Sequence, residues 1–240
     1  MSIRISAVAK GRNNNFNLIR FLAASMVLVS HSFGFVSGKM FNDPLDLLIG
    51  VGMGDLAVNI FFITSGFLVT GSLFNHSSVR NFILARVFRI YPALVVAVLF
   101  TVILGMFFSS LTLLEYFGHS DVWLYLARNM TVLWPGLPLR IADVFQGNPM
   151  SGLVNGSLWT LPWELAMYMS LATGGLLMVI GMSQRILKIV FLSAGILVTI
   201  YFNYLYIQGK ANPFFIEYTA ARLTSFFFIG SSFYILKDKI

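Results

Sequence analysis

The sequence of 240 residues contains no cysteine and very little charge. The lack of cysteine excludes disulfides, thiolate metal ligands and cysteine nucleophiles. Only 10% of the residues are charged and 58% are hydrophobic, whereas soluble domains carry about 25% charged residues. With a mean hydropathy of +0.82, this composition excludes an ordinary soluble domain and indicates a polytopic membrane protein.

The apolar residues are grouped into long segments. A membrane-spanning helix needs about 20 mostly apolar residues, and we predict spans at residues 18–37, 56–74, 90–109, 158–181, 189–208 and 216–236. The predicted fold class is therefore all-α, a polytopic transmembrane helix bundle with about six spans.

Three other segments complete the predicted organisation. Residues 47–54 form a short apolar run that is either re-entrant or an extension of the second span. Residues 122–134 are also too short to cross a bilayer and carry Arg128, so we interpret them as an interfacial helix. Residues 135–156 are rich in Pro, Gly and Asn and are predicted to be the main loop.

The distribution of Lys and Arg predicts the orientation of these spans. With the N-terminus in the cytoplasm, ten of these residues fall in inside segments and four in outside segments. This bias predicts two cytoplasmic termini, with residues 1–13 as a basic cytoplasmic N-terminus. The net charge of +7 is thereby explained by membrane orientation, and no nucleic-acid partner is predicted.

The first span carries two ionisable residues, Arg20 and His31, eleven positions apart. Eleven steps of about 100° leave the two side chains about 20° apart around the helix and about 16 Å apart along it. Ala24 and Val27 lie on the same stripe and either leave a groove or seat another helix. An intramembrane ionisable group is a functional candidate. The structural alternatives are that Arg20 extends to the headgroups and that His31 binds a neighbouring helix.

Polar residues of other spans are predicted to lie at a similar depth. Counting about 1.5 Å per residue from the predicted boundaries places His31, Glu164 and Arg222 near one level, with Ser65 slightly deeper. Such a cluster indicates a site. The structural alternatives are an ion pair between Glu164 and Arg222 that holds the bundle together, and a packing role for Ser65 beside glycine.

A second candidate site lies at the predicted cytoplasmic entry of the third span. Arg86 and Arg89 are three residues apart on one helix face, and Pro92 follows closely and is expected to kink the helix. Two guanidinium groups suit a phosphate-bearing ligand. The alternative is ordinary anchoring by positive residues on the inner side.

Four short motifs together resemble the membrane-bound acyltransferase 3 family, which includes bacterial O-acetyltransferases that modify surface polysaccharides. The Arg and His of the family's first helix are matched by Arg20 and His31. The second-helix pattern FFxxSGF is matched by FFITSGF at residues 61–67, and Arg-x-x-Arg before a proline by RVFRIYP at residues 86–92. The pattern W-[ST]-L-x-x-E is matched by WTLPWE at residues 159–164.

The resemblance implies an acyl transfer reaction across the membrane domain of residues 14–240. Acetyl-CoA or another acyl-CoA would be the co-substrate, with no permanently bound cofactor, and Arg86, Arg89 and Arg20 would hold its phosphates. His31 would act as general base on a sugar hydroxyl, because a neutral imidazole accepts a proton near pH 7. Glu164 would orient the imidazole or bind the acceptor.

The remaining candidates complete the expected site. A covalent acyl intermediate on His31 or Ser65 is the alternative to direct transfer, and Arg222, Trp159 and Tyr168 are expected to bind substrate. The expected acceptor is a cell-surface glycan or a lipid-linked sugar, and the expected location is the bacterial inner membrane, in contact with its lipids. No metal site is predicted, because no His or carboxylate pairs occur at ligand spacing.

Two other classes of function fit the same residues. A transporter or flippase also carries His, Glu and Arg in the membrane. Domains of the acyltransferase 3 family usually continue through several more helices, whereas the resemblance here covers residues 14–236. We therefore expect the N-terminal portion of such a domain, and a non-catalytic subunit or inactive truncated homologue is the second alternative.

Overall fold

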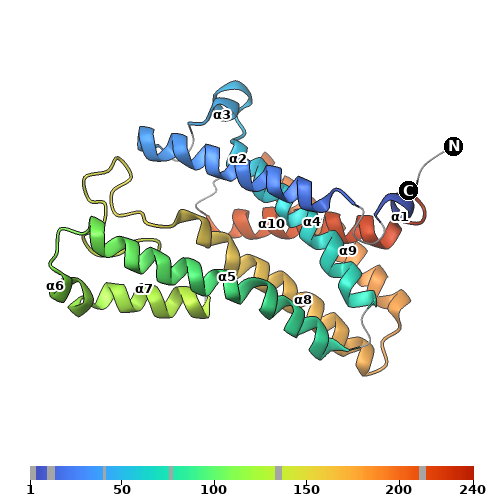
Figure 1. The fold of residues 1–240 in the computed structure, drawn as a ribbon. Coiled ribbons are helices and arrows are strands. Elements are labelled where there is room, and N and C mark those ends of the chain that lie inside the picture. Colours follow the sequence, from blue (N-terminus) through green and yellow to red (C-terminus); the bar gives the residue numbers. More distant parts are fainter. Residues whose placement is uncertain (1–3, 10–13, 40–41, 76–77, 133–136, 211–214) are drawn as a thin grey trace. The chain divides into compact units, whose positions relative to one another are not determined.

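The computed structural model describes residues 4–9, 14–39, 42–75, 78–132, 137–210 and 215–240. The prediction of an all-α fold is confirmed, since these residues form helices, two isolated β-bridges and no β-strand. In chain order the helices are α1 (Ile5–Val8), α2 (Phe16–Ser37), α3 (Pro44–Ile49), α4 (Met53–Asn75), α5 (Val79–Phe108), α6 (Leu113–Gly118), α7 (Ser120–Thr131), the 3₁₀ helix η1 (Gly156–Thr160), α8 (Leu161–Val179), α9 (Gln184–Ile207) and α10 (Ile216–Leu236) (Figure 1).

The chain forms two compact units. Unit 1 comprises residues 1–30, 43–82 and 167–240, and unit 2 comprises residues 31–42 and 83–166. The boundary in the first span falls between Ser30 and His31, so that α2 contributes to both units.

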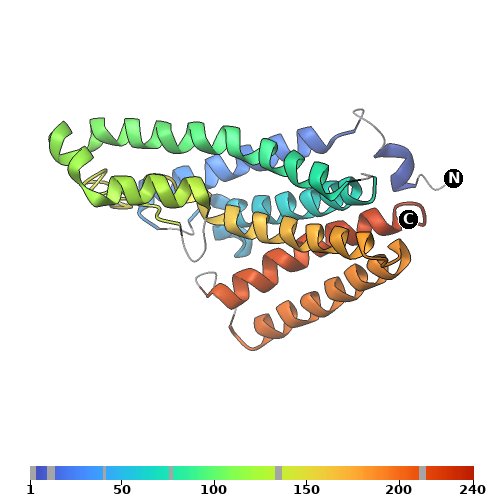
Figure 2. The same ribbon diagram turned by 90° about the horizontal axis from the view of Figure 1, so that it is seen from below.

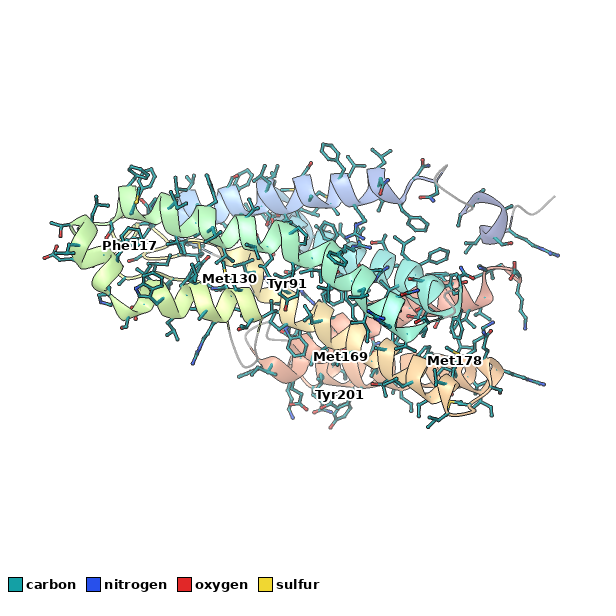
Figure 3. The ribbon with its side chains drawn as sticks, turned by 60° about the horizontal axis from the view of Figure 1, so that its bottom comes forward. Tyr91, Phe117, Met130, Met169, Met178 and Tyr201 are labelled. Atoms are coloured by element: carbon teal, nitrogen blue, oxygen red, sulfur yellow. The ribbon has the colours of Figure 1, made fainter. Side chains whose placement is uncertain are left out.

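Each of the six predicted spans contains a helix. Four of these, α2, α4, α5 and α9, are long and apolar enough to cross a membrane. Their outer surfaces carry many exposed apolar side chains, which suit contact with lipid. Figure 3 labels exposed side chains on two neighbouring elements, Met169 on α8 and Tyr201 on α9. These features identify an integral membrane protein.

Helices α8 and α10 are not among these four, and both pack alongside α9. Thr199 contacts Ser225, and Phe191 contacts Phe228, so α9 and α10 run antiparallel. The short turn before α9 brings Gly174 of α8 against the side chain of Phe191. Three consecutive helices of unit 1 therefore alternate in direction (Figure 2), as the prediction of about six spans requires.

The closest approach within unit 1 is the crossing of α4 and α10. A Cβ atom on Gly66 would overlap the carbonyl oxygen of Phe227, and one on Gly230 would overlap the carbonyl oxygen of Ile63. Glycine at both positions therefore allows the two backbones to touch. Ser231 Oγ accepts a hydrogen bond from Thr70 Oγ at 2.8 Å beside this contact.

Several element boundaries differ from the predicted ones. Helix α5 begins at Val79, eleven residues before the predicted third span, and continues through Pro92 without a break. Residues 47–54 contain the end of α3, a left-handed Gly50 with φ of 71°, and the first two residues of α4. Only the last two residues of this run, Met53 and Gly54, therefore extend the second span.

Unit 2 has its own apolar core. The segment predicted to be an interfacial helix contains α7 (Ser120–Thr131), which buries Val122, Tyr125 and Asn129 on one face. Its position at the membrane interface stays a prediction. Tyr116 on α6 donates a hydrogen bond to the carbonyl oxygen of Val102 on α5 at 2.9 Å. The described part of the predicted main loop before η1, residues 137–155, packs against this core through Ile141 and other apolar residues without forming a helix.

The two described ends of the chain lie together in unit 1. The Ile5 N–H donates to the carbonyl oxygen of Ile240 at 2.9 Å, and the Ser6 N–H donates to that of Lys237 at 3.1 Å. Of the predicted basic N-terminus at residues 1–13, only residues 4–9 are described; Lys10 and Arg12 lie outside the described residues.

Candidate functional site

Helix α2 carries both Arg20 and His31 on one continuous helix, as predicted. His31 is half-buried, and its Nδ1 lies 3.4 Å from Ser157 Oγ in η1. The imidazole also packs edge to face on Phe35, one turn further along α2, at 6.4 Å between ring centroids. One ring nitrogen of His31 is thus directed toward a hydroxyl group, and both partners belong to unit 2.

Ser157 is a site residue that the sequence analysis missed. It lies two residues before the Trp159 of the WTLPWE motif, between the predicted main loop (135–156) and the predicted fourth span (158–181). A serine in a polar loop gives no signal of its own, and only the fold brings it to His31. The available hint was the position of this hydroxyl next to a motif that carries candidate site residues.

Glu164 and Trp159 belong to the same unit as His31. Helix α8 begins at Leu161, so Glu164 lies in its first turn, and Trp159 lies in the preceding η1; both are half-buried. The predicted span began at residue 158 and ran straight through both, which is wrong, because the chain forms a 3₁₀ turn before the helix. Their predicted roles remain hypotheses.

Arg86 and Arg89 lie on the first half of α5, where the helix extends beyond the predicted span. Arg86 is half-buried and Arg89 is exposed. Positions three apart on a helix are neighbours on its surface, so one continuous helix presents both guanidinium groups on the same side. The helix continues through Pro92, so the arginine pair and the apolar part of the third span belong to one helix, and the expected kink stays a prediction.

Arg20 contacts the second family motif. Its guanidinium carbon lies 5.8 Å from the ring centroid of Phe61, the first residue of FFITSGF, within the range of a cation–π interaction. Ala23 is buried in place of Ala24, which is exposed, so the predicted stripe is displaced by one residue at this point.

Ser65 and Tyr168 are both buried in unit 1, with 4% and 5% of their surface exposed. Ser65 precedes Gly66, whose hydrogen atoms face the backbone of α10. This environment favours the packing alternative for Ser65, since small residues permit such close helix contacts. Tyr168 lies on α8 in the part of the helix that belongs to unit 1.

Arg222 forms an ion pair with Asp55, at 2.6 Å between Nη1 and Oδ1. The structural alternative paired Arg222 with Glu164, and the pairing that the structure describes is different. Arg222 is 7% exposed, so its charge is neutralised inside the unit. Asp55 was missed because the second span was predicted to begin one residue after it, whereas α4 begins at Met53.

Asp43 is a second acidic residue that the sequence analysis missed. Its carboxylate accepts hydrogen bonds from Ser30 Oγ at 2.6 Å and from the backbone N–H groups of Leu45, Asp46 and Met53. Burial alone would raise the pKa of Asp43, but these four hydrogen bonds outweigh it and lower the pKa. The hydrogen bond from Ser30 to this carboxylate holds the α2 residue that directly precedes His31.

No group of three or more metal-binding side chains occurs in the part of the chain that the structure describes.

Known proteins of similar sequence identify the family of this chain. A sequence profile described as an acyltransferase domain, of the acyltransferase 3 type, matches residues 13–240. Nodulation protein 10 of Rhizobium leguminosarum bv. viciae is 35% identical over 172 residues, which cover 68% of this chain and 44% of that protein. The O-acetyl transferase of Shigella phage Sf6 is 34% identical over 158 residues, which cover 65% of this chain and 44% of that protein.

The chain spans less than half the length of these curated relatives, and no solved structure gives a significant match. The profile nevertheless covers nearly all of the chain, including both arginine motifs, FFITSGF and WTLPWE. The chain belongs to the acyltransferase 3 family of membrane proteins.

Proposed function

We propose that this chain acts in a membrane acyltransferase that moves an acyl group, an acetyl group in the simplest case, from acyl-CoA to a hydroxyl of a cell-surface carbohydrate. The observation that carries the proposal is His31, a half-buried imidazole on an apolar helix with Nδ1 directed at Ser157. Membership of the family and the name of the phage relative support acyl transfer.

His31 is the general base of the proposed reaction. When Nδ1–H donates to Ser157 Oγ, the lone pair of Nε2 is free to accept the proton of the acceptor hydroxyl. The 3.4 Å contact is long for a hydrogen bond, as catalytic contacts often are before substrate binds. The hydroxyl oxygen attacks the thioester carbon, the C–S bond breaks, and the proton held at Nε2 passes to the departing CoA thiolate.

The acyl-CoA donor is assigned to Arg86 and Arg89, with Arg20 further along the predicted path. Guanidinium groups bind phosphate oxygens in pairs, and both α5 arginines precede the apolar part of their helix. The donor is a co-substrate and leaves as CoA, so the reaction needs no permanently bound cofactor.

Glu164 is assigned to orienting His31 or to binding the acceptor, and Trp159, Tyr168 and Arg222 are assigned to binding substrate. Direct transfer is preferred over a covalent intermediate on Ser65, because Ser65 is 4% exposed beside the α4–α10 backbone contact. The acceptor is a cell-surface glycan or a lipid-linked sugar that approaches from outside.

The proposed location is the bacterial inner membrane, with both termini in the cytoplasm. The contact between Ile5 and Ile240 supports an even number of crossings, and the distribution of positive residues supports the cytoplasmic side. Acyl-CoA would then meet Arg86 and Arg89 on the side where it is made.

The test is His31→Gln, because glutamine keeps hydrogen bonding but does no acid–base work at neutral pH. In cells that depend on this chain for glycan O-acetylation, the variant should insert normally and lose transfer by about 10²–10⁴-fold. The matched control is His119→Gln, since His119 is exposed at the start of α7, and it should keep near-normal transfer. Near-normal acetylation by a well-inserted His31→Gln variant would refute the proposal.

A further inference from the structure

The Asp55–Arg222 ion pair belongs to a larger polar group, of which the proposed reaction uses only Arg222. Asn59 lies one turn after Asp55 on α4, which places their Cβ atoms about 5–6 Å apart on the same helix face. Asp55 holds Arg222 of α10 through Nη1. Asn59 and the inner part of the Arg222 side chain are therefore neighbours at one level of the α4–α10 pair.

Two buried polar atoms of this group have no hydrogen-bond partner among the described residues. They are Asn59 Oδ1, which is an acceptor, and Arg222 Nε, which carries a donor hydrogen. Buried polar groups are nearly always paired in native proteins, so one acceptor and one donor in adjacent positions call for a ligand. Asp55, with 25% of its side chain exposed, provides access from the surface.

The charges of the group determine which ligand suits it. The Arg222 guanidinium is already neutralised by the Asp55 carboxylate at 2.6 Å, so neither an anion nor a cation gains from binding there. A hydroxyl group both donates and accepts, and it matches Asn59 Oδ1 and Arg222 Nε–H together. Tyr218, one turn before Arg222 on α10, adds an aromatic ring next to the site.

We propose that Asp55, Asn59 and Arg222 form a binding subsite for a neutral, hydroxyl-rich ligand, a carbohydrate unit. That this unit is part of the acyl acceptor rests on the proposed function; the subsite itself does not. Asn59 and Arg222 would bind one sugar hydroxyl, while Asp55 keeps the guanidinium in place and the group electrically neutral.

The experiment measures the thermal unfolding of the full chain in lipid nanodiscs with methyl α-glucopyranoside as the probe. A ligand that binds only the folded protein raises Tm with its concentration. The wild type should show this rise, and Asn59→Leu, which removes the acceptor but fills the same space, should abolish it. Sodium acetate at equal concentration should give no comparable rise.

The matched control is Asn203→Leu on α9, where the exposed amide donates only to the carbonyl oxygen of Thr199 within its own helix. This variant should keep the response to the glycoside. No rise in wild-type Tm, the outcome expected if ordered water alone satisfies both atoms, would overturn the subsite. An unchanged response in Asn59→Leu would overturn it as well.

The outcome also separates this proposal from the proposed enzyme. A glycoside response that disappears in Asn59→Leu supports the subsite even if His31→Gln leaves acetylation intact. Loss of acetylation in His31→Gln, with no glycoside response in the wild type, supports the enzyme and refutes the subsite.

Discussion

The α4–α10 crossing and the end of α2 that carries His31 are built from opposite kinds of contact. At the crossing, two glycines bring backbones together and the surrounding polar groups are buried and bonded to each other. Around His31 the ring is half-buried and meets Ser157 across a longer contact. The first region is sensitive to added volume, and the second to the loss of a particular polar atom.

This difference separates two of the family motifs. FFITSGF contributes Gly66 to a backbone contact and Phe61 to a cation–π contact with Arg20, which are both packing roles. The segment around WTLPWE instead places polar side chains near the end of α2 without burying them fully. Three substitutions test this contrast.

The largest effect is expected for Gly66→Ala. The new Cβ atom would overlap the carbonyl oxygen of Phe227, a backbone atom that cannot move without separating the helices. We expect a loss of stability of about 3 kcal/mol or more, at the upper end for overpacked sites, measured as a fall in Tm or in folded yield. Gly147→Ala is the control, since no atom lies within 4 Å of its Cβ position. Equal stability of the two variants would contradict the packing role.

A smaller effect is expected at Asp43, which ties α2 to the start of α4. Asp43→Asn weakens the hydrogen bonds from Ser30 and three backbone N–H groups, and should cost about 1–3 kcal/mol at pH 7. The pKa of Asp43 is lower in the folded state than in the unfolded chain. Its contribution is therefore complete above the unfolded pKa and is lost as pH falls through the folded pKa.

The measurement is the free energy of unfolding of both proteins from pH 7 downward. The difference between wild type and Asp43→Asn should shrink as the pH falls into the range where the Asp43 carboxylate takes up a proton. A difference that stays constant over this range would show that the charge of the Asp43 carboxylate contributes nothing to the free energy of unfolding.

The smallest effect is expected for Ser157→Ala, which tests the region around His31. Because Ser157 is exposed, its loss should leave Tm unchanged. If its hydroxyl orients His31, the acyl transfer rate should fall by about 5- to 10-fold, the value of one neutral hydrogen bond of roughly 1 kcal/mol, and Ser157→Thr should restore much of it. A fall in Tm with no change in transfer would assign Ser157 to packing.

Much of the fold was predictable because long apolar runs leave the chain few choices in a membrane. All six predicted spans contain helices, and the shared helix of Arg20 and His31 follows from the apolar segment that contains both. The start of α5 was missed because Arg86, Arg89 and Pro92 resemble a boundary. Proline removes only one backbone hydrogen bond, however, and a helix can continue through it when the surrounding turns are stable.

The site was predictable only in part, since its contacts join segments far apart in the sequence. The missed residues lie outside the predicted spans, where polar residues are common and do not by themselves indicate a site; they are Asp43, Asp55 and Ser157. Their partners, Ser30, Arg222 and His31, become neighbours only after the helices have packed. The pairing of Arg222 with Asp55, 167 positions away in the sequence, follows from the direction in which α4 and α10 run.

That direction has an electrostatic consequence. Asp55 pairs with Arg222 near the start of both helices and Asn75 with Tyr234 near their ends, so α4 and α10 are parallel. Parallel neighbours place their partial positive charges, about half an elementary charge per helix N-terminus, at the same end, where they repel. Asp55 and Glu217 lie in the first turns of the two helices. Their carboxylates offset this macrodipole repulsion at the end where it is greatest.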